Sequence, residues 1–169
     1  VRLPMHAVIR ADGGSNIGYG HLIRSATLAE AVISKGHTVT VGTATPEPAR
    51  TVLPAAVDVV DLPTRGDPDP FVEWLDTATP DVVFTDAYPV DTAYQRRIRD
   101  RVPIAVLQDD GRHAVCADLF ANGNLYATEL SYDFVGEPPT TCLGPEYVLL
   151  RREIRDRTVF DPPWRAVPE

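Results

Sequence analysis

The chain has 169 residues, of which 44% are hydrophobic, and a formal net charge of −8 at pH 7. This length and composition predict one compact domain with a buried core rather than a disordered segment. The acidic balance, with a pI near 4.9, argues against a nucleic-acid partner, because binding to a phosphate backbone needs a basic face. A small anionic ligand is compatible with this charge, since a local pocket can oppose the sign of the whole chain.

The sequence also argues against a membrane-spanning segment and against a bound cofactor. No apolar run approaches the roughly 20 residues that a membrane-spanning helix needs, and residues 1–14 resemble an entering strand rather than a cleavable signal peptide. We therefore expect a cytoplasmic protein with no membrane partner. The two cysteines, Cys116 and Cys142, are too few for a disulfide framework and lack metal-ligand spacing, so we expect no metal and no other cofactor.

Strand and helix patterns alternate along the first two thirds of the chain. Short apolar runs predict strands, and apolar residues at helical spacing predict helices between them. The expected strands are residues 5–10, 37–42, 57–62, 81–86 and 103–110, and the expected helices are residues 20–35, 46–53, 69–78 and 90–101. This alternation, with short connections, predicts an α/β fold: a Rossmann-like open parallel sheet with helices on both faces.

Beyond the fifth predicted strand the pattern is less regular. We expect short strands over residues 116–124 and 147–151, separated by a stretch that contains glycine and proline. Residues 151–169 begin with a helical pattern and end in prolines, which is typical of a linker between domains. The expected organisation is an N-terminal domain over residues 1–155 and a linker over residues 156–169.

A glycine-rich loop, "RADGGSNIGYGHLIR" (10–24), connects the first predicted strand to the first helix. In an open α/β sheet the first strand-to-helix turn is the usual ligand site. The helix start offers unpaired N–H groups and the positive end of its dipole, which stabilise an anion. Glycines here, including Gly18 and Gly20, allow positive φ and close approach of a ligand to the backbone.

Two common anion-binding loops do not fit these residues. A nucleotide triphosphatase loop needs Lys-Ser or Lys-Thr after its last glycine, but Gly18 is followed by Tyr19, Gly20 and His21. A dinucleotide-binding loop needs a third glycine, and Ile23 fills that position. The distinctive residue is His21, because the positive helix end disfavours its protonated form and leaves a base that could deprotonate a water. A histidine that only hydrogen-bonds the loop fits the pattern equally well.

The same loop resembles the D-x-x-x-x-I-G-x-G-H-x-x-R signature of a known family. These are the UDP-2,4-diacetamido-2,4,6-trideoxy-β-L-altropyranose hydrolases of pseudaminic acid biosynthesis and the related spore coat polysaccharide biosynthesis proteins. The stretches "VVFTDAY", "DDGRHAVCADLFANGN" and "CLGPEYVLLRREI" also agree in order, so the resemblance extends from about residue 6 to 155. The matching loop residues are Asp12, Ile17, Gly18, Gly20, His21 and Arg24.

The resemblance implies a fold and a reaction. It implies the N-terminal half of a two-domain glycosyltransferase-B fold, whose C-terminal nucleotide-binding domain is absent from this chain and is expected in cis. It implies hydrolysis of a UDP-linked diacetamido-trideoxy sugar, with release of UDP and without a metal, in nonulosonic acid or surface-polysaccharide biosynthesis. We expect little or no turnover by this chain alone.

Site residues follow from the resemblance together with the position of each residue. His21 and Tyr88 are expected to be catalytic, His21 by assisting water attack at the anomeric carbon and Tyr88 by contacting sugar or diphosphate, although a surface aromatic fits Tyr88 too. Asp12 is expected to orient the loop through turn hydrogen bonds. Arg24 could reach a phosphate or form a salt bridge with Asp12.

The remaining candidates lie on later loops. The residues expected to bind the substrate are Asp12, Gly18, Gly20, Arg24, Asp110 and Asn124. For Asp109 and Asp110, an ordinary turn is favoured over an acid/base pair. His113 is a candidate to line the cleft.

Two other functions fit the same residues. One is a glycosyltransferase-B type transferase whose N-terminal half binds an acceptor, in which His21 would deprotonate a sugar hydroxyl. The other is a non-catalytic module that binds a sugar or phosphate ligand.

Overall fold

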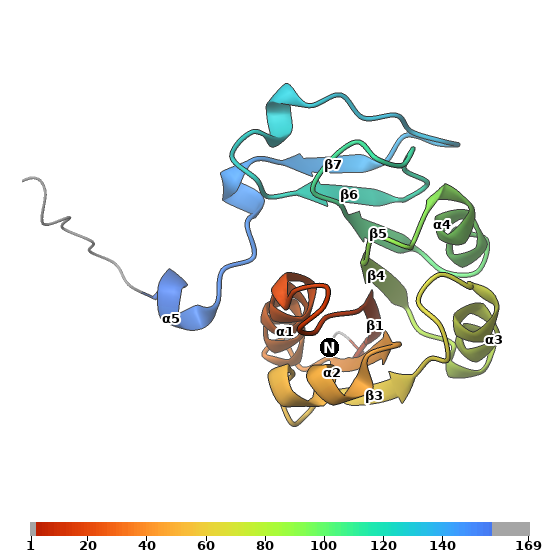
Figure 1. The fold of residues 1–169 in the computed structure, drawn as a ribbon, viewed down its shortest axis with the longest axis vertical. Coiled ribbons are helices and arrows are strands. Elements are labelled where there is room, and N and C mark those ends of the chain that lie inside the picture. Colours follow the sequence, from red (N-terminus) through yellow and green to blue (C-terminus); the bar gives the residue numbers. More distant parts are fainter. Residues whose placement is uncertain (1–2, 157–169) are drawn as a thin grey trace, which may run out of the picture.

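The computed structural model describes residues 3–156, which contain one seven-stranded parallel sheet (Figure 1). The strands are β1 (His6–Ala11), β2 (Thr38–Thr43), β3 (Asp58–Asp61), β4 (Val82–Asp86), β5 (Ile104–Leu107), β6 (Leu119–Asn122) and β7 (Thr140–Leu143). Their order in the sheet is β3-β2-β1-β4-β5-β6-β7, and every neighbouring pair is parallel. The predicted α/β class and parallel sheet are therefore confirmed.

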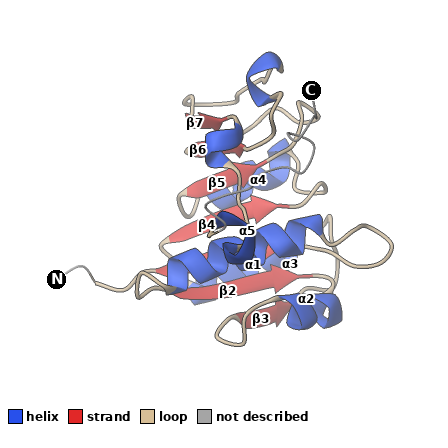
Figure 2. Ribbon diagram, turned by 90° about the vertical axis from the view of Figure 1, so that its left-hand side faces the viewer, coloured by secondary structure: helices blue, strands red, loops and turns tan. Residues whose placement is uncertain are grey.

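Helices cover both faces of this sheet, as the alternation predicted. The helices α1 (Gly20–Ile33) and α2 (Pro46–Val52) lie on one face, and α3 (Asp69–Ala78) and α4 (Thr92–Arg99) lie on the other (Figure 1). Figure 2 shows α1 in front of the sheet, between β4 and β2 and roughly along the direction of the strands. Alternate residues of β1 supply the two apolar cores, with Ile9 facing α1 and Val8 facing α3 and α4.

The last strand differs from the prediction. The expected strand over residues 147–151 is wrong, because the segment that pairs with β6 is β7. Pro145 begins a 3₁₀ turn, η2 (Pro145–Tyr147), shortly after β7. Val148 then packs closely against Gly123: a Cβ added to Gly123 would lie 2.7 Å from the Val148 Cα. The helical start of the final segment is confirmed as α5 (Arg152–Arg155). Apart from its first residue, the predicted linker over residues 156–169 lies outside the described residues.

A buried ion pair at the end of β1 fixes the base of the glycine loop. Arg10 Nη1 lies 2.9 Å from Asp12 Oδ1, and both side chains are fully buried. Asp12 Oδ1 also accepts hydrogen bonds from the Ala44 N–H (2.8 Å) and the Thr43 hydroxyl (3.2 Å) after β2. Arg10 Nη2 donates to the Arg65 carbonyl oxygen at 2.9 Å. Asp12 therefore anchors a neighbouring loop rather than making turn hydrogen bonds within its own.

The same pair sets the charge state of Asp12. Burial alone would raise the pKa of this carboxyl, but the hydrogen bond and the charge of Arg10, helped by the Ala44 N–H, lower its pKa below the ordinary value of 3.8. The folded protein therefore favours ionised Asp12.

Replacing Asp12 should destabilise the protein strongly, because the change leaves Arg10 as a buried charge without its counter-ion. We expect Asp12→Asn to lower the free energy of unfolding by about 3 to 5 kcal/mol, measured by urea denaturation at pH 7. The exposed Arg50–Asp61 pair offers a matched control, and Asp61→Asn should cost less than about 1 kcal/mol. Equal small losses for both variants would contradict a structural role for the buried pair.

The pH dependence of stability should follow from the lowered pKa of Asp12. The stabilisation from ionised Asp12 is present above about pH 4 and is lost as the pH falls through the folded-state pKa. The wild-type protein should therefore lose more stability than Asp12→Asn between about pH 5 and pH 2.

Candidate functional site

The glycine loop turns back on itself before α1 begins. The Gly14 N–H donates to the Gly18 carbonyl oxygen at 3.0 Å, and the Ile17 N–H donates to the Gly14 carbonyl oxygen at 3.2 Å. Gly18 has φ +83°, in the left-handed region where a side chain is strained. A Cβ added at Gly18 or at Gly20 would meet nothing within 4 Å, so the two glycines differ in backbone conformation: Gly20 does not have a positive φ. The fold therefore requires glycine at 18 but not at 20.

His21 meets a carboxylate at the point where the strand order of the sheet reverses direction. β1 and β4 are neighbours, and their carboxyl ends face the crevice in which ligands of such sheets bind. His21 Nδ1 lies 2.6 Å from Asp86 Oδ1, and both side chains are buried. A separation this short between a nitrogen and a carboxylate oxygen requires a proton between them. Arg24 Nη2 also lies 2.9 Å from His21 Nδ1, but its N–H groups have carboxylate acceptors in Asp86 and Asp109. We therefore assign the proton to Nδ1, which leaves the lone pair on Nε2.

Arg24 lies one turn further along α1 and bridges two carboxylates. Its Nε and Nη2 donate to Asp86 at 2.8 and 2.7 Å. Its Nη1 and Nη2 donate to Asp109 at 2.7 and 3.1 Å. Burial opposes the charge, but the two carboxylates prevail and raise the pKa of Arg24 above its ordinary value. The alternative salt bridge between Arg24 and Asp12 is wrong, because Asp12 pairs with Arg10 instead.

Amide side chains after β6 extend this network. The Asn124 Nδ2 donates to Asp109 Oδ1 at 3.1 Å and to Asn122 Oδ1 at 2.8 Å. The Asn122 Nδ2 donates to the Asp109 carbonyl oxygen at 3.1 Å. Asn124 is thus connected to His21 through Asp109, Arg24 and Asp86.

Tyr88 stands directly over His21. The two rings meet edge to face with centroids 4.6 Å apart. The guanidinium carbon of Arg112 lies 3.7 Å from the centre of the Tyr88 ring. His113 Nε2 lies 3.1 Å from the Tyr88 carbonyl oxygen, so the loops after β4 and β5 are joined. Asp110 accepts from the Arg112 backbone N–H at 3.0 Å, as the favoured turn requires, and pairs with the Arg112 side chain.

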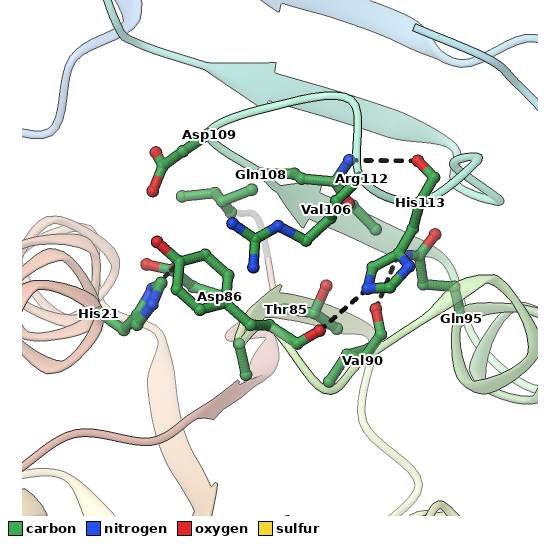
Figure 3. A pocket seen from close by; sticks show the side chains of 13 residues that line it. His21, Thr85, Asp86, Val90, Gln95, Val106, Gln108, Asp109, Arg112 and His113 are labelled. Atoms are coloured by element: carbon green, nitrogen blue, oxygen red, sulfur yellow. Dashed lines mark hydrogen bonds and ion pairs between the residues drawn. The ribbon is translucent and has the colours of Figure 1, made fainter. Parts of the chain in front are cut away.

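These groups surround one pocket, shown from close by in Figure 3. The predicted residues that line it are His21, Tyr88, Asp109 and His113. Arg24 and Asn124 line a second hollow on the far side of Asp109, together with residues 147–149. Asp12 lies in neither lining, because it is buried against Arg10 at the base of the loop.

Three residues of the site were not predicted from the sequence in the roles they have here: Asp86, Asp109 as a bridging carboxylate, and Arg112. Asp86 ends β4, and Asp109 follows β5 by two residues, so a signal was present. Acidic residues at the carboxyl ends of adjacent parallel strands meet at one edge of the sheet. Arg112 gave no comparable signal, because its contact with Tyr88 depends on how two loops fold together.

No group of three or more His, Cys, Asp or Glu side chains among residues 3–156 could hold a metal ion. Within the same range, no helix has the length and apolar character needed to cross a membrane.

Neither a scan against protein-family models nor a search of curated proteins finds a match for this chain. Solved structures do resemble it. The crystal structure of Acinetobacter baumannii MurG covers 93% of this chain and 50% of its own, with a TM-score of 0.52 and 13% identity. Phytolacca americana UGT2 complexed with UDP-2fluoro-glucose and pterostilbene covers 75% of this chain and 33% of its own, with a TM-score of 0.47 and 16% identity.

The likeness to MurG concerns the fold. It places the α/β sheet among the Rossmann-like half-domains of the glycosyltransferase-B type. The chain spans about half the length of MurG.

The hydrogen bond to Asp86 should fix the tautomer of His21. In wild-type protein at about pH 8.5, above the usual range of histidine, the neutral ring should carry its proton on Nδ1. Long-range ¹⁵N NMR of the imidazole distinguishes the two nitrogens. In Asp86→Asn the carboxylate acceptor is lost, and a mixture of tautomers is expected. A proton on Nε2 in the wild-type protein would contradict the assignment.

Proposed function

We propose that this chain is the sugar-facing half of an enzyme that hydrolyses a UDP-linked sugar and releases UDP. The observation that supports this most is the contact between His21 and Asp86 at the ligand crevice of the sheet. A buried carboxylate on Nδ1 directs the base nitrogen, Nε2, away from Asp86 and stabilises the imidazolium that forms when Nε2 takes a proton. The resemblance of the loop to nucleotide-sugar hydrolases supports the substrate class.

The proposed reaction is a displacement at the anomeric carbon. A water oxygen forms the new bond to that carbon while the bond to the diphosphate oxygen breaks. His21 Nε2 accepts the proton of the water, and UDP leaves with the electron pair of the broken bond. The N–H groups at the start of α1, where no side chain of the described residues caps the helix, would stabilise the negative charge on the diphosphate. Asp86 accepts hydrogen bonds from Arg24 and, in the tautomer assigned above, from His21.

The sugar is proposed to be a diacetamido-trideoxy sugar of nonulosonic acid or surface-polysaccharide biosynthesis, in the cytoplasm. A second, nucleotide-binding domain in cis is proposed to hold the uridine, in keeping with the half-length match to MurG. Tyr88, over the His21 ring, would then cover the sugar side of the cleft.

Removing the base should abolish most of the activity. In a polypeptide that carries both domains, we expect His21→Asn to slow UDP release by about 100-fold or more without loss of folding. UDP is measured without an acceptor, because release under that condition separates hydrolysis from transfer to a sugar hydroxyl. His37→Asn is the matched control, since His37 contacts the Met5 N–H at the opposite edge of the sheet. A His21→Asn rate within a few-fold of wild type would show that His21 is not the base.

The two glycines should separate a folding role from a ligand role. Gly18→Ala forces a side chain into the left-handed region and should cost about 1 to 2 kcal/mol of unfolding free energy. Gly20→Ala should leave stability unchanged or slightly higher, since its Cβ enters open space at a helix start. If the ligand approaches the backbone there, Gly20→Ala should nevertheless raise KM about tenfold. Unchanged KM would remove Gly20 from the binding site.

A further inference from the structure

We propose that Arg112 binds a phosphate oxyanion of the ligand in the pocket that holds His21. The proposal takes the location of the ligand from the proposed function, but it concerns binding rather than hydrolysis. Nothing in the sequence patterns pointed to this residue. Its basis is the geometry of Arg112, Asp110 and Tyr88.

One edge of the Arg112 guanidinium is occupied and the other is available. Nε lies 2.9 and 3.1 Å from the two Asp110 carboxylate oxygens, and Nη2 lies 2.6 Å from Oδ2. Nη1 has no hydrogen-bond partner among residues 3–156. A guanidinium can bind two oxyanions through different edges. An anion can therefore bind the edge of Nη1 and Nη2 while Asp110 keeps its place.

Tyr88 holds this available edge inside the pocket. The guanidinium stacks on the Tyr88 ring at 3.7 Å, and the same ring meets the His21 ring edge to face. Figure 3 shows the Arg112 side chain extending from its loop into the pocket, toward the side where His21 lies. The stacking and the contact with Asp110 order the side chain before a ligand arrives, so little rotamer freedom is lost on binding.

The other guanidinium of the site cannot serve in the same way. Arg24 donates from all three nitrogens to Asp86 and Asp109, and it is more buried than Arg112. Using Arg24 for a ligand phosphate would leave Asp86 without the donor that orients it. The two arginines therefore have separate tasks: Arg24 positions the carboxylates, and Arg112 meets the ligand.

Phosphate is the oxyanion that fits this arrangement. Arginine binds phosphate through two parallel N–H groups, and the available edge of Arg112 offers that fork. The start of α1, next to His21, adds N–H groups and the positive dipole end on the other side of the pocket. A diphosphate that spans the pocket would touch both.

The test is a titration of this chain with inorganic pyrophosphate at constant ionic strength, followed by ¹⁵N NMR of the arginine Nε–H and backbone signals. Wild type should bind with shifts at Arg112 and at the start of α1. Arg112→Gln should bind about tenfold more weakly or worse, the loss expected for a charged hydrogen-bonding partner. Equal affinity for wild type and Arg112→Gln, or no binding by wild type, would overturn the proposal.

Matched variants isolate the geometry from the charge. Arg101→Gln removes an arginine with the same exposure, 36% against 37%, that also pairs with an aspartate but lies outside the pocket, and its affinity should stay within twofold of wild type. Tyr88→Phe should keep the affinity and Tyr88→Ala should reduce it, because Arg112 stacks on the ring of Tyr88 and not on its hydroxyl group. An equal loss in Arg101→Gln and Arg112→Gln would show a general charge effect and overturn the proposal.

The binding result does not depend on turnover. If Arg112→Gln loses pyrophosphate while the two-domain polypeptide releases no UDP, the oxyanion site stands and the hydrolase proposal fails. If UDP is released but wild type and Arg112→Gln bind pyrophosphate equally, the hydrolase proposal stands and the oxyanion site fails.

Discussion

The candidate site depends on one guanidinium placed between two carboxylates. Arg24 reaches from α1 to Asp86 at the end of β4 and to Asp109 after β5. It therefore joins elements that are far apart in the sequence. Without it, two carboxylates would face each other across the crevice and repel. With it, both carboxylates share one guanidinium, and Asp86 presents one oxygen to His21 in a fixed direction. The orientation of the histidine therefore depends on the Arg24–Asp86 ion pair, both members of which contact His21 Nδ1.

The same geometry bears on the choice between functions. A base nitrogen on His21, held by Asp86, serves equally for a water and for a sugar hydroxyl, so the network itself does not select hydrolysis or transfer. What would select it is the shape of the space above Tyr88 and the position of a second domain. A carboxylate behind the imidazole can serve binding as well as catalysis, because a carboxylate also stabilises an imidazolium, which attracts a phosphate. The Asp86 contact therefore supports the proposed base, and the assay of UDP release decides between the functions.

Local features of this molecule could be predicted from the sequence, and long-range contacts could not. The helix at residues 69–78 follows from its own apolar spacing, and the turn at Asp110 follows from its own residue types. The strand over 147–151 was wrong because pairing with β6 decides which segment becomes the edge strand, and β7 lies earlier in the chain. The partners of Arg24 were missed for the same reason, since no local pattern relates it to strands far along the sequence. The acidic residues at the ends of adjacent strands, Asp86 and Asp109, were the one sequence signal that could have located the site.

Asp109 lines two neighbouring hollows, and this position links them. One hollow contains His21, and the other is lined by Asn124 and residues 147–149. Asn124 donates to the same carboxylate oxygen that receives Arg24. Arg24 and Asn124 both line the second hollow, and both donate to the carboxylate that lines the two. A continuous series of contacts thus runs from Asn124 through Asp109, Arg24 and Asp86 to the His21 imidazole in the neighbouring hollow.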